Sequence, residues 1–407
     1  MNKIVIAGAF FLLAAVGFTT LPVSRFYAPV LTLPAGFSST LVADSLGKVR
    51  HIDVNSQGGI YVKLSVLKDG KGMYYLTDLN KDGIIDKKTT FADYPGTGVK
   101  IKGNYLYSTS NSSVYRYQLN NKGEVINPDK PELIVDGLLD KKRDNSKSIA
   151  LDDQNNLYVT IGSYSDACRE GNTGKGMPGC PILDSAGGIW LFKANKPNQS
   201  FKDGVRYATG LKNSVGIDWN PTTKTLFATH HGRGAFADKF PEKFTAQQNA
   251  DLPAETIYEL KKGVDAGWPF TYYDQFQKKN ILAPEYGGDG KIEGDKKYIN
   301  PAIAFPAHLA PNDLLFYTGN MFPARYKNGA FVVFHAKSTE LKKGYFVAFV
   351  PFVNGKPSGD WEVFAENFTG PTGPVQYRPM GLAQGPDGAL YIADDVKGAI
   401  FKITYKK

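Results

Sequence analysis

The fold is decided by the stretch HIDVNSQGGIYV at residues 51–62. It combines a short apolar strand, a polar turn with two glycines, and a second strand that begins with an apolar, an aromatic and a small or β-branched residue. The same pattern recurs four more times along the chain, at residues 99–108, 149–159, 215–228 and 380–392, with a looser copy at 314–317. A pattern that returns through the whole chain predicts a repeat architecture.

Each copy carries one aromatic anchor, and successive anchors lie between 46 and 89 residues apart: Tyr61, Tyr107, Tyr158, Phe227, Phe316 and Tyr391. A propeller blade takes roughly 40–50 residues, and longer intervals hold loop insertions. We therefore predict an all-β, six-bladed β-propeller with four-stranded antiparallel blades over residues 33–407. A β-sandwich array would explain the strands but not the repeat. The strand expected at residues 37–42 would close the ring by joining the last blade.

Composition supports a turn-rich β-protein and argues against a nucleic-acid-binding one. The 407 residues include 43 Gly, 24 Pro, 23 Tyr and 25 Phe, residue types that are frequent in turns and strands. The formal net charge of +9 is scattered along the sequence. Scattered charge is typical of a solvated surface, so we expect no nucleic-acid partner.

The N-terminal segment, residues 1–24, has the form of an export signal. Lys3 precedes an apolar run at residues 4–18, as in a secretory signal peptide or an N-terminal membrane anchor. Both interpretations place the rest of the chain outside the cytoplasm, either periplasmic or membrane-anchored and facing the periplasm.

Cys168 and Cys180 are the two cysteines of the chain and share a glycine-rich loop. In an exported protein this pair predicts a local disulfide. Two thiols without partner histidines would make a poor zinc site.

One loop has the spacing of a calcium site. Oxygen-bearing side chains occupy its positions 1, 3, 5 and 9, with Gly83 at position 6: Asp78, Asn80, Asp82 and Asp86. This spacing lets a tight loop wrap a hard cation. Position 12 is Thr89 instead of a bidentate Glu, so the alternative is a turn with solvated acids.

Polar side chains next to strands are the candidates for chemistry. Asp144 precedes an expected strand near the central channel, where an acid could act as a general base. His230 and His231 are adjacent and should point to opposite faces, so they are not expected to share a metal. No G-x-S-x-G, Walker or H-E-x-x-H motif occurs, and the corresponding enzyme classes lack support.

Several segments together resemble the glucose/sorbosone dehydrogenase family. They are ATGLKNSVG (208–216), LPAE (252–255), AGWPF (266–270), LAPEYGGDG (282–290), FPAHLAP (305–311), FPARY (322–326) and YRPMG (377–381). The resemblance implies a six-bladed propeller that holds pyrroloquinoline quinone (PQQ) and Ca²⁺. It also implies oxidation of a sugar or aldehyde by hydride transfer to PQQ, with electrons leaving to a periplasmic acceptor such as a cytochrome.

The family's functional residues carry over incompletely. Its base histidine falls on Asp144, and the Arg of its Arg-Asn pair falls on Lys212, followed by Asn213. Lys212 would polarise the quinone less than Arg, because an ammonium cannot form a bidentate fork.

The remaining correspondences concern metal and cofactor carboxylates. A carbonyl site for Ca²⁺ would fall on Gly232 and Arg233, although the carboxylate beside it in the family is Gly234 here. Lys337 matches a PQQ-contacting lysine, and Arg378 matches a carboxylate clamp.

Two hypotheses follow. In the first, the protein is a quinoprotein sugar dehydrogenase with Asp144 as base and Lys212, Asn213, Lys337 and Arg378 as cofactor-binding residues. In the second, the altered pocket has lost catalysis, and the exported propeller binds a glycan or a protein partner. A hydrolytic propeller ranks last, because few acids gather near the channel.

Overall fold

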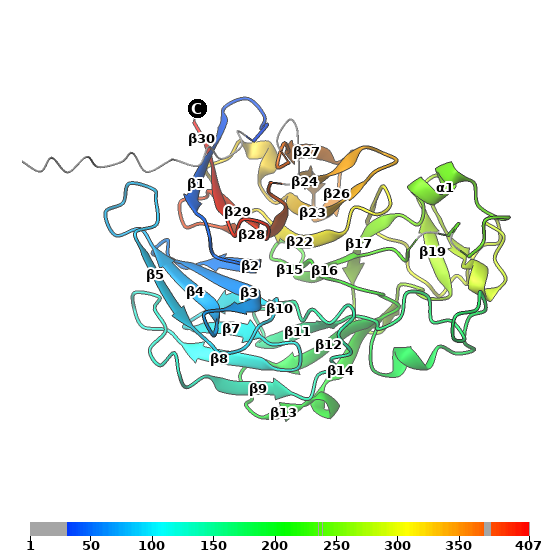
Figure 1. Ribbon diagram of the computed structural model, residues 1–407, viewed down its shortest axis with the longest axis horizontal. Coiled ribbons are helices and arrows are strands. Elements are labelled where there is room, and N and C mark those ends of the chain that lie inside the picture. Colours follow the sequence, from blue (N-terminus) through cyan, green and yellow to red (C-terminus); the bar gives the residue numbers. More distant parts are fainter. Residues whose placement is uncertain (1–30, 235, 238, 370–375, 407) are drawn as a thin grey trace, which may run out of the picture.

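Four-stranded antiparallel sheets are arranged around a central axis like the blades of a propeller (Figure 1). The computed structural model describes residues 31–234, 236–237, 239–369 and 376–406, and these residues form six such blades. The predicted fold class is therefore confirmed. The expected leader at residues 1–24 lies outside the described residues. Within them, no helix is long and apolar enough to cross a membrane.

The first three blades follow the chain in order. One comprises β2 (Val49–Val54), β3 (Ile60–Lys68), β4 (Lys71–Thr77) and β5 (Lys87–Phe91). The next comprises β6 (Val99–Lys102), β7 (Tyr105–Thr109), β8 (Val114–Gln118) and β9 (Glu132–Asp136), to which β13 (Gln199–Ser200) adds in parallel. The third comprises β10 (Ile149–Leu151), β11 (Asn156–Ile161), β12 (Gly188–Lys193) and β14 (Val205–Thr209), extended by the parallel β18 (Val264–Asp265).

The last three blades complete the circle. They comprise first β15 (Ile217–Asn220), β16 (Thr225–His230), β17 (Glu255–Leu260) and β21 (Ile303–Phe305). Next come β22 (Pro311–Phe316), β23 (Ala330–Ser338), β24 (Lys343–Val350) and β27 (Glu362–Ala365). The closing blade contains β28 (Pro379–Gln384), β29 (Leu390–Asp394), β30 (Ile400–Tyr405) and β1 (Phe37–Ala43).

The innermost strands make a closed ring, because each contacts its counterpart in the next blade: β2, β6, β10, β15, β22 and β28, with β28 returning to β2. Hydrogen bonds from side chains join some of these neighbours. The Asp53 carboxylate accepts from the Ile101 N–H at 2.6 Å, and Asp313 accepts from the Leu382 N–H at 2.7 Å. The ring therefore fixes the relative positions of segments that are far apart in sequence.

The ring closes through the strand predicted at residues 37–42. β1 pairs antiparallel with β30, from Phe37 opposite Tyr405 to Ala43 opposite Ile400, and Figure 1 shows the two strands side by side. The Phe37 ring contacts Phe322 and Phe364, with centroids 4.8 and 5.0 Å apart. These rings belong to a large apolar cluster between this blade and its neighbour. Closure thus rests on aromatic packing as well as strand pairing.

The aromatic anchors lie where the repeat predicts, with one exception. Tyr61, Tyr107, Tyr158, Phe227 and Tyr391 all lie on the second strands of their blades. Phe316 instead ends the first strand, β22, and the second strand β23 begins only at Ala330. A 3-10 helix (Ala324–Tyr326) occupies the connection in place of a tight turn. The looser copy at residues 314–317 therefore lies on the first strand of its blade, not on the second strand as the repeat predicts.

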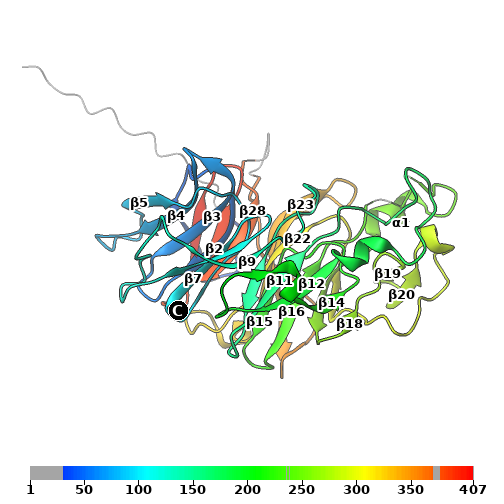
Figure 2. The same cartoon turned by 90° about the horizontal axis from the view of Figure 1, so that it is seen from below.

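One insertion extends away from the ring (Figures 1 and 2). It contains α1 (Ala246–Asp251), the hairpin of β19 (Thr271–Asp274) and β20 (Lys279–Leu282), and the 3-10 helix Pro284–Tyr286. The remaining short elements are β25 (Phe352–Val353), β26 (Lys356–Pro357) and the 3-10 helices Pro181–Asp184 and Phe201–Asp203.

Candidate functional site

A pocket of about 360 Å³ lies at one end of the ring of inner strands. Its wall comes from residues at or next to the ends of strands in several blades. The polar residues that line it are Arg50, Lys142, Asp144, Asn145, Ser146, Asn213, His231, Asn312 and His335. Two of the predicted site residues, Asp144 and Asn213, are therefore brought together here from different blades.

Asp144 lies in the loop before β10 and carries a left-handed backbone, with φ of 43°, a conformation that Asp tolerates better than most residues. Its carboxylate accepts from the Lys212 ammonium at 3.1 Å and faces the Asn213 amide nitrogen at 3.5 Å. Gly162 makes this approach possible. A Cβ on Gly162 would lie 2.2 Å from the Asp144 carbonyl oxygen and 2.8 Å from Asn213 Oδ1.

His231 also lines the pocket and is held as a neutral ring. Its Nε2 lies 3.2 Å from the Pro311 carbonyl oxygen and its Nδ1 lies 3.3 Å from the Asn213 amide nitrogen. Because a carbonyl can only accept, the ring proton is on Nε2, and Nδ1 accepts from Asn213. Burial, and then the positive charge of Lys212, lowers the pKa of His231 to about 3.

His230 faces away from this pocket, as expected for adjacent residues. Its Nε2 accepts from the Lys212 backbone N–H at 2.9 Å. Burial lowers the pKa of His230 to about 3 as well, with a further contribution from the Lys212 charge. The two histidines therefore have different partners, and among the described residues no group of three or more His, Cys, Asp and Glu could hold a metal ion.

His335 lines the pocket and is held from behind by an ion pair. Arg378 donates to the Asp395 carboxylate at 2.8 and 2.9 Å, and the same carboxylate pairs with His335 at 3.0 Å. Burial alone would raise the pKa of Asp395, but these hydrogen bonds outweigh it and lower the pKa to about 2. Arg378 therefore stands behind His335 and Asp395 instead of lining the pocket. Lys337 is exposed on β23 and lies outside the described lining residues.

Three buried polar atoms of the lining residues lack a hydrogen-bond partner among the described residues. They are Arg50 Nε, Asn213 Oδ1 and Asn312 Oδ1. The Arg50 guanidinium also donates from Nη1 to the Met380 sulfur at 3.3 Å. Buried polar atoms are normally paired. These unpaired donors and acceptors are available to a polar ligand.

Charged groups behind Asp144 form a continuous chain, here called the ion-pair network. Lys212 lies 3.7 Å from Asp166 in addition to Asp144, and Asp166 also pairs with Arg143 and Arg233. Its described members are Arg143, Asp144, Asp166, Arg169, Lys212, Arg233 and Glu285. Burial would raise the pKa of Asp166, but Lys212, the Gly234 N–H and the nearby arginines lower it instead.

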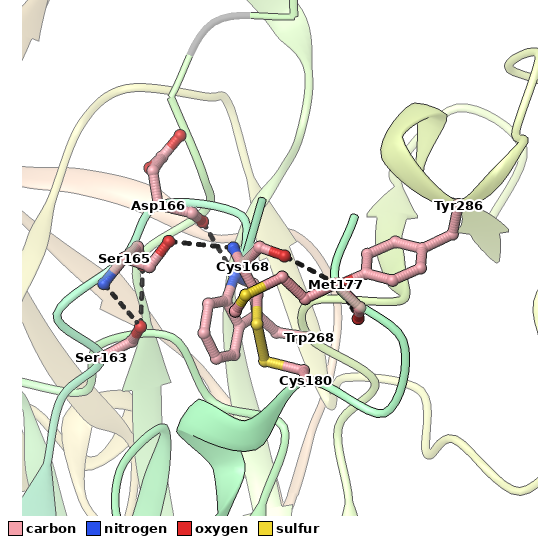
Figure 3. Close-up of a disulfide and its surroundings, with 8 residues drawn as sticks. All are labelled: Ser163, Ser165, Asp166, Cys168, Met177, Cys180, Trp268 and Tyr286. Atoms are coloured by element: carbon pink, nitrogen blue, oxygen red, sulfur yellow. Dashed lines mark hydrogen bonds between the residues drawn. A yellow bond between two sulfur atoms is a disulfide. The ribbon is translucent and has the colours of Figure 1, made fainter. Parts of the chain in front are cut away.

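The predicted disulfide is confirmed and lies next to this network (Figure 3). Cys168 and Cys180 are bonded, with their Cα atoms 6.0 Å apart. The Trp268 indole N–H donates to the Asp166 carbonyl oxygen at 2.9 Å, and the Tyr286 hydroxyl donates to the Cys168 carbonyl oxygen at 3.3 Å. Asp166, two residues before this cross-linked loop, lies within reach of Lys212.

The two calcium expectations have different surroundings. In the loop of residues 78–86, Asp78 accepts from the Gly83 N–H at 2.8 Å and Asp86 from the Leu79 N–H at 2.6 Å. Both carboxylates accept from backbone N–H groups within the loop, and its calcium site stays a prediction. At the second place, the Gly232 N–H donates to Glu255, and the Arg233 guanidinium pairs with Glu285. A guanidinium beside this loop opposes a cation there.

Arg50, Asp166, His231 and His335 are the site residues that sequence reasoning missed. Arg50 directly precedes the copy of the repeat at residues 51–62, and this position at the start of an inner strand was the available signal. His231 was noticed for its adjacency to His230, but no pattern in the sequence showed that it would face Asn213. Asp166 lies two residues before Cys168, and only folding brings it to Lys212.

Comparison with known proteins identifies the family. A model of the TrAA12-like family matches residues 31–274 and 270–406. The chain therefore belongs to the TrAA12-like family.

Sequence relatives support this assignment. A pyrroloquinoline quinone-dependent sugar dehydrogenase of Hypocrea jecorina is 25% identical over 402 residues, covering 90% of this chain and 87% of that protein. An uncharacterised protein of Borreliella burgdorferi is also 25% identical, over 202 residues that span 49% of this chain and 48% of that protein.

Solved structures share the fold. The Trichoderma reesei protein of Carbohydrate-Active Enzymes Family AA12 superimposes with a TM-score of 0.74 at 19% identity, covering 93% of this chain and 98% of that one. The holo PQQ domain of pyranose dehydrogenase from Coprinopsis cinerea gives a TM-score of 0.71 at 19% identity, covering 92% and 97%. The resemblance to quinoprotein sugar dehydrogenases drawn from the sequence is confirmed.

Proposed function

We propose that the protein is a quinoprotein oxidoreductase that oxidises a hydroxyl group of a sugar in the pocket around Asp144. The observation that carries this proposal is the pocket wall itself. One carboxylate, Asp144, lies among cationic and amide groups, and three buried polar atoms there have no partner among the described residues.

The pocket residues fit PQQ, a flat quinone with three carboxylates. A site for it needs several cations and few acids. Arg50 and Lys142 line the pocket, and Arg378 stands behind it. The volume of about 360 Å³ is within the usual range of cofactor sites. Arg50 and Lys142 would hold carboxylates of the cofactor, whereas Arg378 is engaged by Asp395.

The residues of the chain divide the remaining work. Asp144 takes up the proton of the sugar hydroxyl as general base. Lys212 keeps this carboxylate oriented toward Asn213, and its second partner Asp166 balances the ammonium charge once Asp144 is protonated. The neutral His231 keeps the Asn213 amide in place. When bound, PQQ supplies the acceptor for the hydride that leaves the sugar carbon.

The protein would also have a defined location and an electron acceptor. Ca²⁺ is implied by the family resemblance, but the Arg233 guanidinium opposes a cation at the Gly232–Arg233 segment, so the proposal assigns it no role in the reaction. The N-terminal segment supports export to the periplasm, with or without retention as an anchor. There a cytochrome would take the electrons. N-terminal sequencing of the native protein tests the location, because a cut leader removes residues that an anchor keeps.

PQQ binding to the purified protein tests the proposal directly. Melting curves and absorbance spectra are recorded with PQQ, with and without Ca²⁺. A ligand at 100 times its Kd stabilises a fold by about 2.7 kcal/mol, which a melting curve resolves. Reduction of an artificial dye with a panel of aldoses then follows.

The other outcome points to the binding-module hypothesis. The structure gives it one specific support, because the Arg378 clamp is already engaged by Asp395. No PQQ-dependent shift at saturation, together with no dye reduction by any aldose, would overturn the dehydrogenase proposal. Glycan binding to the same pocket would then be tested by calorimetry.

A further inference from the structure

Lys147 is a fully buried lysine next to the Asp144 pocket. Its side chain is 0% exposed, and its ammonium donates to the backbone carbonyl oxygen of Asn145 at 2.8 Å. Burial, opposed in part by the charge of Asp140, lowers the pKa of Lys147 to about 8. A buried ammonium is costly for a fold because it loses its hydration. An apolar side chain would avoid this cost, so a lysine at this position points to a role other than stability.

The backbone of the loop at residues 140–147 needs restraint. Lys142 and Asp144 have φ of 64° and 43°, in the left-handed region that side-chain-bearing residues seldom adopt. Residues 141–143 are exposed, so their side chains contribute little packing to the loop. Hydrogen bonds therefore have to keep Asp144 in this conformation.

Two charged side chains hold the loop from opposite sides. On the exposed side, the Asp140 carboxylate accepts from the Lys142 N–H and from the Asn145 amide nitrogen, both at 2.9 Å. On the buried side, the Lys147 ammonium donates to the Asn145 carbonyl oxygen. Both sets of contacts therefore meet at Asn145, the residue that directly follows Asp144.

The backbone of Lys147 is anchored to the neighbouring blade. Its carbonyl oxygen accepts from the Thr109 hydroxyl at 2.7 Å, and Thr109 is the last residue of β7. Gly98 makes this close approach possible, because a Cβ there would lie 2.6 Å from the same carbonyl oxygen. The ammonium therefore reaches the loop from a point that the ring of blades fixes.

We propose that Lys147 is a positioning residue that holds the loop of residues 140–147 and thereby the direction of the Asp144 carboxylate. In this direction the carboxylate meets the Lys212 ammonium at 3.1 Å and the Asn213 amide nitrogen at 3.5 Å. Lys147 acts through Asn145 and is not one of the residues that line the pocket. Its effect on turnover rests on the proposed function, whereas its effect on the loop does not.

Limited proteolysis tests the hold on the loop without any substrate. Trypsin cleaves after lysine and arginine, and Lys141, Lys142 and Arg143 form an exposed run in this loop. Lys147→Met removes the ammonium and keeps a side chain of similar length. We expect cleavage after residues 141–143 to become several-fold faster, relative to cleavage after the exposed Lys122 of the same molecule. Mass spectrometry of the fragments measures both rates.

Steady-state kinetics of the PQQ-loaded protein test the effect on the base. A displaced base slows the chemical step, and a misplacement of about 1 Å can cost about 10²-fold in rate. We therefore expect Lys147→Met to lower kcat by up to about 10²-fold. KM for the sugar and the PQQ-induced rise in Tm should stay the same, whereas a general loosening of the fold would weaken PQQ binding as well.

Lys63→Met is the matched control. Lys63 is also 0% exposed, and its ammonium donates to the Tyr94 carbonyl oxygen at 2.8 Å, in a loop that does not line the pocket. This variant should keep both kcat and the rate of cleavage after residues 141–143. Lys147→Leu, with a shorter apolar side chain, is the second test variant and should behave as Lys147→Met does.

Three results would overturn the proposal. In the first, Lys147→Met and Lys147→Leu are cleaved no faster than the unsubstituted protein. In the second, cleavage is faster but kcat per folded molecule is unchanged. In the third, Lys63→Met accelerates the same cleavage equally. If the unsubstituted protein oxidises no aldose, the proposed function fails, and the cleavage rates still decide whether Lys147 holds the loop.

Discussion

The closing blade and the wall of the Asp144 pocket are built by opposite kinds of interaction. Around β1 and β30 the contacts are aromatic and aliphatic, and Phe331, Val333 and Ile403 are fully buried. Behind Asp144 the contacts are ion pairs, and several polar atoms of the pocket lack a protein partner. The apolar side chains of the closing blade are packed against one another, whereas some polar atoms of the pocket wall have no hydrogen-bond partner.

This difference separates stability from function. Apolar burial stabilises without regard to the protonation of side chains, because it removes uncharged surface from water. A charged wall is sensitive to protonation, and its unpaired groups are available to a ligand. Substitutions in the two regions should therefore affect different measurements, and each prediction below tests that separation.

Replacement of the proposed base should have the largest effect. Asp144→Asn keeps the shape of the side chain but removes its ability to take a proton, so we expect turnover with a reactive aldose to fall by about 10²–10⁴-fold. The PQQ-induced rise in Tm should remain. Steady-state dye reduction measures the first quantity, and melting curves the second.

Asp360→Asn, at an exposed carboxylate far along the chain, is the control and should leave turnover unchanged. If Asp144→Asn keeps full turnover, Asp144 is not the base. The expectation that substitutions in the pocket wall act on function would then be wrong.

Removal of a closing-blade ring should act on stability alone. Phe37→Ala deletes a partly buried ring that contacts Phe322, Tyr326 and Phe364. We expect a loss of about 2–3 kcal/mol in the free energy of unfolding, somewhat less than for a fully buried ring. Urea or guanidinium denaturation measures it. Turnover per folded molecule should not change.

Phe276→Ala gives the matched comparison, because Phe276 is 66% exposed. Its free energy of unfolding should stay near that of the unsubstituted protein. An equal loss in both variants would show that the closing contacts contribute nothing specific.

Removal of the disulfide should lower both the free energy of unfolding and turnover. The double substitution Cys168→Ser with Cys180→Ser opens a loop of 12 residues, which the chain-entropy estimate values at about 3 kcal/mol. Because Asp166, a partner of Lys212, lies two residues before this loop, we also expect turnover to fall. Denaturation and dye reduction are measured with and without a thiol reductant.

The unsubstituted protein treated with the same reductant is the control for the double variant. If the variant loses stability but keeps full turnover, the cross-linked loop does not position Lys212.

Acid should weaken the charged wall more gradually. The pKa of His230 and of His231 is about 3 in the fold, below the ordinary value near 6.5. The unfolded chain therefore binds protons below pH 6.5 that the folded chain does not, and stability falls as pH drops from about 6.5 toward 3. Each buried histidine contributes at most about 1.4 kcal/mol per pH unit.

Denaturation curves across this pH range measure the slope. His230→Gln should reduce it, because one of the two titrating rings is gone. A slope that stays the same in His230→Gln would show that this ring is not the buried neutral group described above.

The fold was more predictable from sequence than the pocket, for a physical reason. Strand patterns and anchors such as Tyr61 and Tyr391 depend on local periodicity, which the sequence displays directly. The meeting of Asp144 with Lys212 depends on the angle between blades and on the absence of a side chain at Gly162. The family resemblance led to Asp144, Lys212 and Asn213, but Arg50, Asp166 and His335 depend on contacts across blades.

The pairing of β1 with β30 also sets an order of events during synthesis. Ser38 and Thr404 share a hydrogen bond across 366 positions of the chain, so the ring cannot close until almost the whole polypeptide has been made. Until then the edges of the first and last blades are open to other chains. Loss of residues 400–405 should therefore leave β1 without its partner strand and make the protein prone to aggregate.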